Sequence, residues 1–583
     1  MTEKLITPST LITATENTRI NNASEGTELS YVEEFDDILE VVGSFGRYQK
    51  WLLLLIFMPV SFFTAFTSNL FLFQMVLPDH WCHVPGRENT SLSVTAWHNL
   101  TRPRSSDTGE PSNCLMRDIQ WTSYNGTLSY KVTNRTKECT DGWEFDTTQF
   151  STTVATTQGW VCERGHYSYY TLSTSMAGNA VGTFLLPLLA DKYVGRRRMF
   201  FVALTIHIVF TIPVICMQGA VAHMFFRFLQ GLAYETNYLM PYIIFMEVIP
   251  SERRALAVML SFIAWTFGMC STALVAWLVP NWRYLSVISL VPSLLGFIYW
   301  KYLPESPRWL LAKGKVVPCA DILLQIGAVN GASKVSRVEV EAQLRVLVRR
   351  QPVDQPFTAM LAYPRLTTRA IMLFIMSFLQ FVVYTVAMLS MTVLSNSFLA
   401  HFVLSVFELP SNFLSWGLIH YFGRRFMAYI TFLLLAVSCF AAPFCIQNES
   451  LLLMVLGFAK LFSTSGLFIV FLMASEVLPT PIRTSGTGIT IVFGMLGMVM
   501  APHVLHSGLG EAGPYWILLG LTMASALAVI PLPETLGLQL PQTFQDAEEL
   551  GQGRPFTSWV HHWNLHRFPQ PPRPPQEEQS QDL

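Results

Sequence analysis

The octapeptides EVIPSERR (residues 247–254) and EVLPTPIR (residues 476–483) decide how this chain is organised. Both begin with Glu-Val, carry Pro at the fourth position and end with Arg, and they lie 229 residues apart. Two further pairs keep nearly this separation: PES (304–306) with PET (533–535), and GRR (195–197) with GRR (423–425). The repeated spacing indicates two similar halves.

The composition is that of a membrane protein. Hydrophobic residues make up 51% of the 583 residues and charged residues only 13%, whereas soluble domains carry roughly 25% charged residues. Residues 51–77 contain no Lys, Arg, Asp or Glu. A run of this length and character predicts a membrane-spanning helix.

Eleven more stretches resemble this first one, and each is near the ~20 residues that a spanning helix needs. The predicted spans are 51–77, 168–190, 199–218, 222–249, 256–278, 283–303, 369–395, 398–420, 426–446, 450–477, 484–505 and 513–533. The first fifty residues lack a short apolar segment behind a basic start, so we expect no cleaved signal peptide.

Lys and Arg gather in alternate connections between the spans, which places those connections in the cytoplasm. The turns that lack both residue types lie near 219–221, 279–282, 396–397, 447–449 and 506–512. The basic connections include GRRR (195–198), ERR (252–254) and the stretch 304–368. We therefore expect a multi-pass protein of the plasma membrane with both termini in the cytoplasm.

The connection 78–165 is long and falls outside in this topology. It contains four N-glycosylation acceptors, namely Asn89, Asn99, Asn125 and Asn134. It also contains four cysteines, namely Cys82, Cys114, Cys139 and Cys162. On an oxidising face these predict two disulfides, with three possible connectivities.

The doubled motifs divide the chain into two halves of six helices, each with its motifs at cytoplasmic helix ends. Repeats with an even number of helices keep the same orientation, as in the major facilitator fold. We expect this fold, an all-α membrane protein. The predicted parts are a cytoplasmic segment (1–50), two halves (51–303 and 369–533), a cytoplasmic linker with short helices (304–368) and a disordered cytoplasmic tail (534–583).

Over nearly its whole length the chain resembles the organic ion transporters of solute carrier family 22. The matching stretches are FDDILEVVGSFGRYQK, RFLQGLAYETNYLMPY, EVIPSERRA, PESPRWLLAKGK, FELP and SEVLPTPIRTSG, together with the large external loop. The opening segment and HWCHVP are most similar to the invertebrate organic cation and carcinine transporters of that family. Two departures lie near the glycines of the GRR motifs: ADKYVGRRR has one residue more than the usual pattern, and His420 stands where Asp is usual.

The charged residues of the doubled motifs are expected to act in gating. When the cytoplasmic side is shut, Glu247 and Arg254 can pair with neighbouring loop charges, and each state of a rocking transporter can have its own partners. The alternative is that these residues only fix topology and helix ends. The candidate gating residues are Asp191, Arg196, Arg197, Glu247, Arg254, Glu305, Arg308, Arg424, Glu476 and Arg483.

Two carboxylates stand near the middle of predicted spans, where charges are rare and functional. Glu235 lies in the fourth span and Glu408 in the eighth, at the depth where this class binds substrate. In the family comparison Glu408 matches an acidic position of cation carriers. Met495 replaces the Arg that is usual in carriers of anions or carnitine. As alternatives, Lys460 could neutralise Glu408 as a structural pair and Arg227 could partly offset Glu235.

Aromatic residues support a cation site, because a desolvated ammonium gains up to ~2 kcal/mol from facing an aromatic ring. The candidates beside Glu235 are Tyr234, Tyr238, Tyr242, Trp265 and Tyr384. The first three recur every four residues, so we expect them along one stripe of the fourth helix. Ordinary packing is the alternative for each. Pro241 and Pro410 are expected to kink their helices.

The sequence thus predicts a transporter of small organic cations that works by alternating access. It contains no nucleotide-binding loop and no catalytic constellation, so we expect no ATP, cofactor, metal or nucleic acid, and no enzyme activity. The predicted partners are the substrate cation and the lipid bilayer. The alternatives are a carrier of zwitterions such as carnitine, and a non-transporting receptor that retains the fold.

The external loop gives a first testable prediction. Changing Asn89, Asn99, Asn125 and Asn134 together to Gln should lower the apparent mass on a gel, because each occupied acceptor carries a glycan. Glycosidase treatment of the wild-type protein should lower its apparent mass by the same amount. A wild-type protein whose mobility glycosidase never changes would contradict the external placement of this loop.

Overall fold

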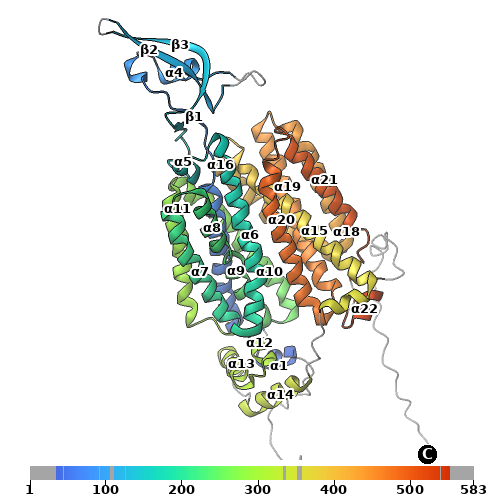
Figure 1. The fold of residues 1–583 in the computed structure, drawn as a ribbon. Helices are drawn as coiled ribbons and strands as arrows, with labels where there is room; N and C mark the ends of the chain where they lie inside the picture. Colours follow the sequence, from blue (N-terminus) through green and yellow to red (C-terminus); the bar gives the residue numbers. More distant parts are fainter. Residues whose placement is uncertain are drawn as a thin grey trace, which may run out of the picture.

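Two bundles of helices stand side by side in the computed structural model, with a small domain at one end and short helices at the other (Figure 1). The structure describes residues 35–43, 45–90, 92–104, 111–124, 127–332, 336–350, 357–536, 538 and 540–551. Helices α1 (Phe35–Val41) and α22 (Phe544–Glu549) both lie toward the end opposite the small domain. The described parts of the chain nearest the two termini are therefore on the same side.

The first half is built from residues 47–300. Its first span is one continuous helix, Arg47–Gln74, that includes α2 (Arg47–Leu52) and α3 (Met58–Gln74). The others are α6 (His166–Leu189), α7 (Arg196–Cys216), α8 (Ala220–Gly231), α9 (Tyr234–Glu247), α10 (Ser251–Leu278) and α11 (Trp282–Gly296).

The linker contains α12 (Pro307–Ala312), α13 (Val316–Asn330) and α14 (Arg337–Arg350). The second half follows with α15 (Pro364–Leu389), α16 (Ser397–Val406), α17 (Glu408–Phe422), α18 (Arg424–Ala441), α19 (Glu449–Val477), α20 (Arg483–Leu505) and α21 (Gly513–Ala528). Helix α15 begins five residues before the predicted boundary of the linker. Helix α22 lies in the segment 534–583, which was predicted to be a disordered tail, so that prediction was wrong for residues 544–549. Residues 552–583 of the predicted tail lie outside the described residues.

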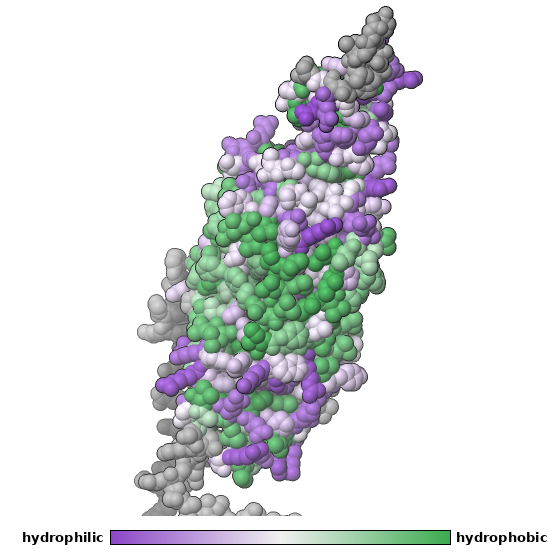
Figure 2. All heavy atoms as spheres, turned by 90° about the vertical axis from the view of Figure 1, so that its left-hand side faces the viewer, coloured by the Kyte–Doolittle hydropathy of each residue, from purple (hydrophilic) through white to green (hydrophobic). Residues whose placement is uncertain are grey.

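Ten helices of the described residues are long and apolar enough to cross a membrane. The shorter α21 and the broken pair α8–α9 bring the number of spans to the predicted twelve. Figure 2 shows the consequence at the surface, a broad hydrophobic band between two hydrophilic ends. The band is the surface that a lipid bilayer covers.

Two predicted spans are interrupted near their middle. The fourth breaks between α8 and α9, and the eighth breaks at Phe407 between α16 and α17. Pro410 explains the second break, because its ring has no N–H for the carbonyl of Val406 and clashes with it. Pro241 lies too far along α9 to explain the first. Both breaks place a glutamate in the first turn of the following helix, namely Glu235 in α9 and Glu408 in α17.

The predicted external loop, residues 78–165, contains β-strands as well as helices. Strand β1 (His80–Cys82) pairs with β4 (Trp143–Phe145), and β2 (Leu115–Tyr124) pairs with β3 (Thr127–Glu138), both antiparallel. Helices α4 (Val94–Thr101) and α5 (Val154–Gln158) complete it. The disulfides join Cys82 to Cys139 and Cys114 to Cys162, which selects one of the three connectivities.

Strands β1 and β4 are also joined through Glu144, which accepts a hydrogen bond from the indole of Trp81 at 2.8 Å and contacts His83 at 2.6 Å. Burial alone would raise the pKa of the Glu144 carboxyl, but these bonds bring it below its ordinary value. Of the predicted acceptors, Asn99 is exposed on α4, and Asn125 lies outside the described residues.

The doubled motifs build the same network in each half. In the first half, Glu305 accepts the backbone N–H groups of Arg196 (2.9 Å) and Arg197 (3.1 Å) at the start of α7. The carboxylate thereby caps a helix terminus whose N–H groups have no partners inside the helix. The guanidinium of Arg196 lies 3.6 Å from Glu247 and 3.1 Å from Asp191.

In the second half, Glu534 accepts the N–H groups of Arg424 and Arg425, each at 3.0 Å, at the start of α18. The guanidinium of Arg424 pairs with Glu476 at 3.0 Å. Thr535 donates to Glu476, as Ser306 does to Glu247 in the first half. The doubled motifs therefore form the same polar junction between helix ends in both halves.

A glycine precedes each capped helix. Gly195 has φ 91° and ψ 158°, and Gly423 has φ 85° and ψ 162°, a region essentially restricted to glycine. A Cβ on either residue would lie 2.5 Å from the capping carboxylate, Glu305 or Glu534. In the first half a π-helical turn, Ala190–Val194, comes directly before the glycine.

The two halves contact each other at the end that carries the small domain. Phe398 on α16 packs against Phe73 on α3 at 5.6 Å between ring centroids. Ser173 on α6 contacts His503 on α20 at 3.2 Å. Toward the other end, the hydrophobic clusters of the described residues each stay within one part, 35–347 or 357–547. This conformation is therefore closed on the side of the external loop.

The junctions give a second prediction. Gly423→Ala should lower the stability of the protein by ~1–3 kcal/mol, because it forces a side chain into a glycine-only conformation beside Glu534. Thermal unfolding of purified protein in detergent measures this loss. Gly520→Ala is the matched control, since a Cβ at Gly520 on α21 meets no atom within 4 Å. Equal melting temperatures for the two variants would contradict the proposed role of Gly423.

Candidate functional site

A buried ion pair occupies the middle of the second half. The Nζ of Lys460 on α19 lies 3.5 Å from the Oε2 of Glu408 on α17. The Lys460 side chain has no exposed surface and that of Glu408 is 3% exposed. The positive end of the α17 dipole lies at Glu408, which also favours a carboxylate there. The alternative weighed from the sequence, that Lys460 neutralises Glu408, is therefore the arrangement found.

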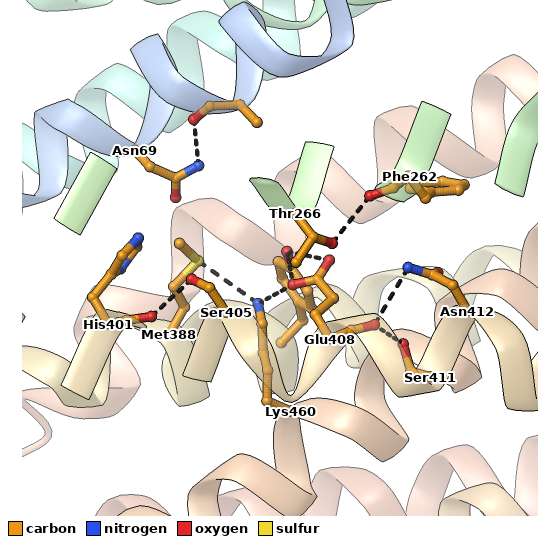
Figure 3. A network of polar contacts seen from close by, with 12 residues as sticks. Asn69, Phe262, Thr266, Met388, His401, Ser405, Glu408, Ser411, Asn412 and Lys460 are labelled. Carbon is orange, nitrogen blue, oxygen red and sulfur yellow. Dashed lines mark hydrogen bonds and ion pairs between the residues drawn. The ribbon is translucent and has the colours of Figure 1, made fainter. Parts of the chain in front are cut away.

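Helix α15 supplies two further contacts to this pair. The Nζ of Lys460 lies 3.0 Å from the centroid of the Tyr384 ring and 3.7 Å from the sulfur of Met388. The hydroxyl of Tyr384 lies 3.4 and 3.5 Å from the two oxygens of Glu408. A carboxylate, an aromatic face and a thioether thus surround one ammonium group (Figure 3).

The first half faces this pair with polar side chains. Figure 3 shows Asn69 from α3 and Thr266 from α10 across from the helices of the second half that carry Glu408 and Lys460. The Nδ2 of Asn69 donates to the carbonyl of Ala65 at 2.7 Å. We did not predict these two residues from the sequence; a polar residue within an apolar span is the signal that could have found them.

Glu235 stands on the first half near the same interface. Its backbone N–H donates to Asn179 on α6 at 3.1 Å, and the amide of Asn179 contacts the sulfur of Met495 on α20 at 3.4 Å. Among the residues that the structure describes, none forms an ion pair with Glu235.

Arg227, the other basic residue considered for Glu235, belongs to a separate network. Its guanidinium donates to Gln230 at 3.1 Å and to Gln74, and it lies 4.5 Å from the ring centroid of Phe71. It also interacts with Tyr234. All these partners are uncharged. Among the described residues, Arg227 therefore has no contact through which it would offset the charge of Glu235, the alternative considered from the sequence.

The three tyrosines predicted to form one stripe all lie on α9 at intervals of four residues, and their ring contacts differ along the helix. Tyr238 packs against Trp265 at 5.5 Å and against Tyr242 at 5.6 Å between ring centroids. Trp265 in turn interacts with Tyr384. Tyr234 lies at the first residue of α9 and faces His207 at 5.8 Å instead. Tyr234 therefore has a different ring partner from Tyr238 and Tyr242, although all three lie on one helix.

The remaining candidate gating residues lie near the helix ends opposite the external loop. Arg483 donates to the carbonyls of Leu478 and Pro541, each at 3.2 Å. Arg308 lies over the ring of Phe35 at 4.9 Å, and its charge acts on Glu247. Arg254 lies in the first turn of α10. The contacts of Arg483 with Leu478 and Pro541, and of Arg308 with Phe35, each join residues of one part of the chain, 357–547 or 35–347.

Comparison with known proteins places this arrangement in a family. Residues 124–546 match the family described as sugar (and other) transporter. The human solute carrier family 22 member 7 is 30% identical, covering 88% of this chain and 96% of that protein. The chain belongs to solute carrier family 22. This transporter is thus a multi-pass membrane protein and not an enzyme, as the sequence motifs predicted.

Two other relatives are named after the compounds that they transport. The beta-alanine transporter of Drosophila melanogaster is 30% identical, over 88% of this chain and 89% of the relative. The carcinine transporter of the same fly is 27% identical, over 90% of this chain and 80% of the relative. The fold is that of the xylose transporter XylE from E. coli in its inward-open conformation, with TM-score 0.52, 18% identity, and coverage of 66% of this chain and 88% of XylE.

The buried pair gives a third prediction. Glu408→Gln or Lys460→Met alone should destabilise the transporter by ~3–5 kcal/mol, because each leaves a buried charge without its partner. The double variant should recover most of this loss. Thermal unfolding in detergent measures it, with Lys301→Met as the control at an exposed lysine. A double variant as unstable as the sum of the two single changes would contradict the pairing.

Proposed function

We propose that this transporter moves a small organic amine with one positive charge across the plasma membrane by alternating access. The observation that carries the proposal is the contrast between the two glutamates. Glu408 has a lysine at 3.5 Å, whereas Glu235 forms no ion pair with any described residue. Counted together with Lys460, the site has one negative charge in excess, which one substrate cation would neutralise.

The surroundings of Glu235 suit an ammonium group. A row of aromatic side chains reaches from the first half into the second. Tyr238 packs against Trp265, and Trp265 interacts with Tyr384. Aromatic faces beside a carboxylate attract ammonium ions, and desolvation strengthens the attraction. The name of the carcinine transporter, a relative whose printed substrate is an amine, supports this class of substrate.

Alternating access is supported by the distribution of contacts between the halves. Phe73, Phe398, Ser173 and His503 close the external side, while the hydrophobic clusters toward the cytoplasm remain separate. Each half is braced internally by its capped junction, so the halves can rock as rigid units. The opposite conformation would separate the external contacts and bring the cytoplasmic ends together.

A zwitterionic amine is the second candidate, because the relative named beta-alanine transporter is 30% identical. Its carboxylate would need a cation in the site. Lys460 is already paired with Glu408 at 3.5 Å, and Met495 offers no charge. Uptake of labelled β-alanine against labelled tetraethylammonium in the same cells distinguishes the two classes.

The proposal makes a fourth prediction. Glu235→Gln should lower uptake of tetraethylammonium at least about tenfold, because an interaction with a charged group contributes roughly 1.5–3 kcal/mol and 1.4 kcal/mol is a factor of ten. Glu163→Gln, at an exposed position of the external loop, is the matched control. Uptake in cells is normalised to protein at the surface. Unchanged uptake by Glu235→Gln would contradict the proposed site.

A further inference from the structure

Residues 149–152 of the external loop contact both halves of the transporter, and we call them the bridging segment. The loop belongs to the first half, since it joins α3 to α6. Gln149 and Phe150 contact the second half. Ser151 and Thr152 contact the first half. Four consecutive residues thus connect two bodies that the proposed transport cycle has to separate on this side.

Gln149 binds the start of α16 through both ends of its side-chain amide. Its Oε1 accepts the backbone N–H of Ser397, the first residue of α16, at 3.2 Å, and its Nε2 donates to the carbonyl of Ser395. The first N–H groups of a helix have no partner inside the helix, so a side-chain oxygen that accepts from one of them is stabilising. Ser395 in turn donates from its Oγ to Glu449, the first residue of α19, at 2.5 Å. Gln149 is therefore attached to a point that two helices of the second half fix.

Phe150 adds an apolar contact next to this amide. Its side chain is buried, and its ring centroid lies 4.8 Å from that of Phe398 on α16. Phe398 also packs against Phe73 on α3, so it contacts two rings from the first half. Aromatic side chains bury a large area and dominate the energetics of such contacts. Separation of the halves on this side would therefore expose apolar rings as well as break the bonds of Gln149.

The other end of the bridging segment is fixed to the first half. The carbonyl of Pro280, between α10 and α11, accepts the N–H of Ser151 at 2.9 Å and its hydroxyl at 2.7 Å. The N–H of Trp282 donates to the carbonyl of Thr152 at 3.2 Å. These bonds stay within the first half, so they can persist when the halves separate. The bonds of Gln149 cross between the halves and have to break.

We propose that the bridging segment holds the transporter shut on the side of the external loop, and that it has to leave α16 before substrate can enter from that side. This inference rests on the alternating access of the proposed function and adds the contact that opposes opening. Strand β4 ends at Phe145, four residues before Gln149, so the small domain is connected directly to this contact. The domain thereby takes part in gating.

A second glutamine of the same loop provides a matched control. The Nε2 of Gln158 donates to the carbonyl of Met217 at 3.2 Å, and its Oε1 accepts the N–H of Gly219 at 3.0 Å. Met217 and Gly219 lie between α7 and α8, so both bonds stay within the first half. Gln149 and Gln158 thus make the same kinds of bond, and of these two it is Gln149 that joins the halves.

The test needs a reporter of opening on the side of the external loop. Ser173 on α6 is buried against His503 on α20, so a cysteine at position 173 should react with a membrane-impermeant maleimide, added outside intact cells, when this side opens. The parent protein is the full chain with Ser173→Cys and with Cys216, Cys270 and Cys445, the free cysteines that are not buried, changed to Ser. The measured quantity is the rate of labelling, normalised to protein at the surface.

Gln149→Ala should raise the labelling rate of the parent at least about fivefold, because loss of two hydrogen bonds shifts the equilibrium toward the open state by about this factor or more. Gln158→Ala should leave the rate unchanged. Gln149→Met keeps the length of the side chain and removes both bonds. It should therefore act in the same direction, and it replaces Gln149→Ala if that variant does not reach the surface.

Three other results would contradict the proposal in different ways. Labelling of the Gln149 variants at the rate of the parent would overturn the role of the bridging segment and leave alternating access standing. Equal acceleration by the Gln149 and Gln158 variants would indicate a general loosening of the loop and would overturn the assignment to Gln149. A parent and variants that are present at the surface but are never labelled would show that this side does not open, which would overturn the alternating access of the proposed function.

Discussion

A carboxylate at membrane depth has to be neutralised, and this constraint organises the centre of the transporter. Lys460 on α19 and Glu408 on α17 meet it by pairing at 3.5 Å, which fixes two helices of the second half against α15. Glu235 is under the same constraint in the first half, where no described residue forms an ion pair with it. One half thus holds a buried ion pair, and the other holds a carboxylate that the proposed substrate cation would neutralise.

Charged side chains are paired in the same way at the helix ends opposite the external loop. Glu305 and Glu534 each cap a helix that begins with GRR, and Glu247 and Glu476 each pair with the first arginine of that helix. These junctions stiffen each half without joining the halves to each other. The proposed alternating access requires this internal rigidity, since each bundle would move as one body while contacts between the halves break and re-form.

The sequence predicted the major facilitator fold and a number of spans compatible with the helices found, because hydrophobic length and repeated motifs are local properties. The pairing of Lys460 with Glu408 was one of two alternatives, since depth along a helix does not give rotation about it. The break before α9 has no proline to signal it, and so the start of a new helix inside the fourth span was not predicted. The disulfide connectivity depended on the strands of the external loop, which the hydrophobic pattern does not reveal.

The π-helical turn Ala190–Val194 bears on how the two halves diverged. Asp191 and His420 are 229 positions apart, but Gly195 and Gly423 are 228 apart, so the first half has one residue more between these positions. An extra residue in a regular helix would rotate all that follows by about 100°. A widened turn takes up the residue locally and leaves the glycine facing Glu305. The helix therefore tolerates a single-codon insertion without losing its alignment with the duplicated copy.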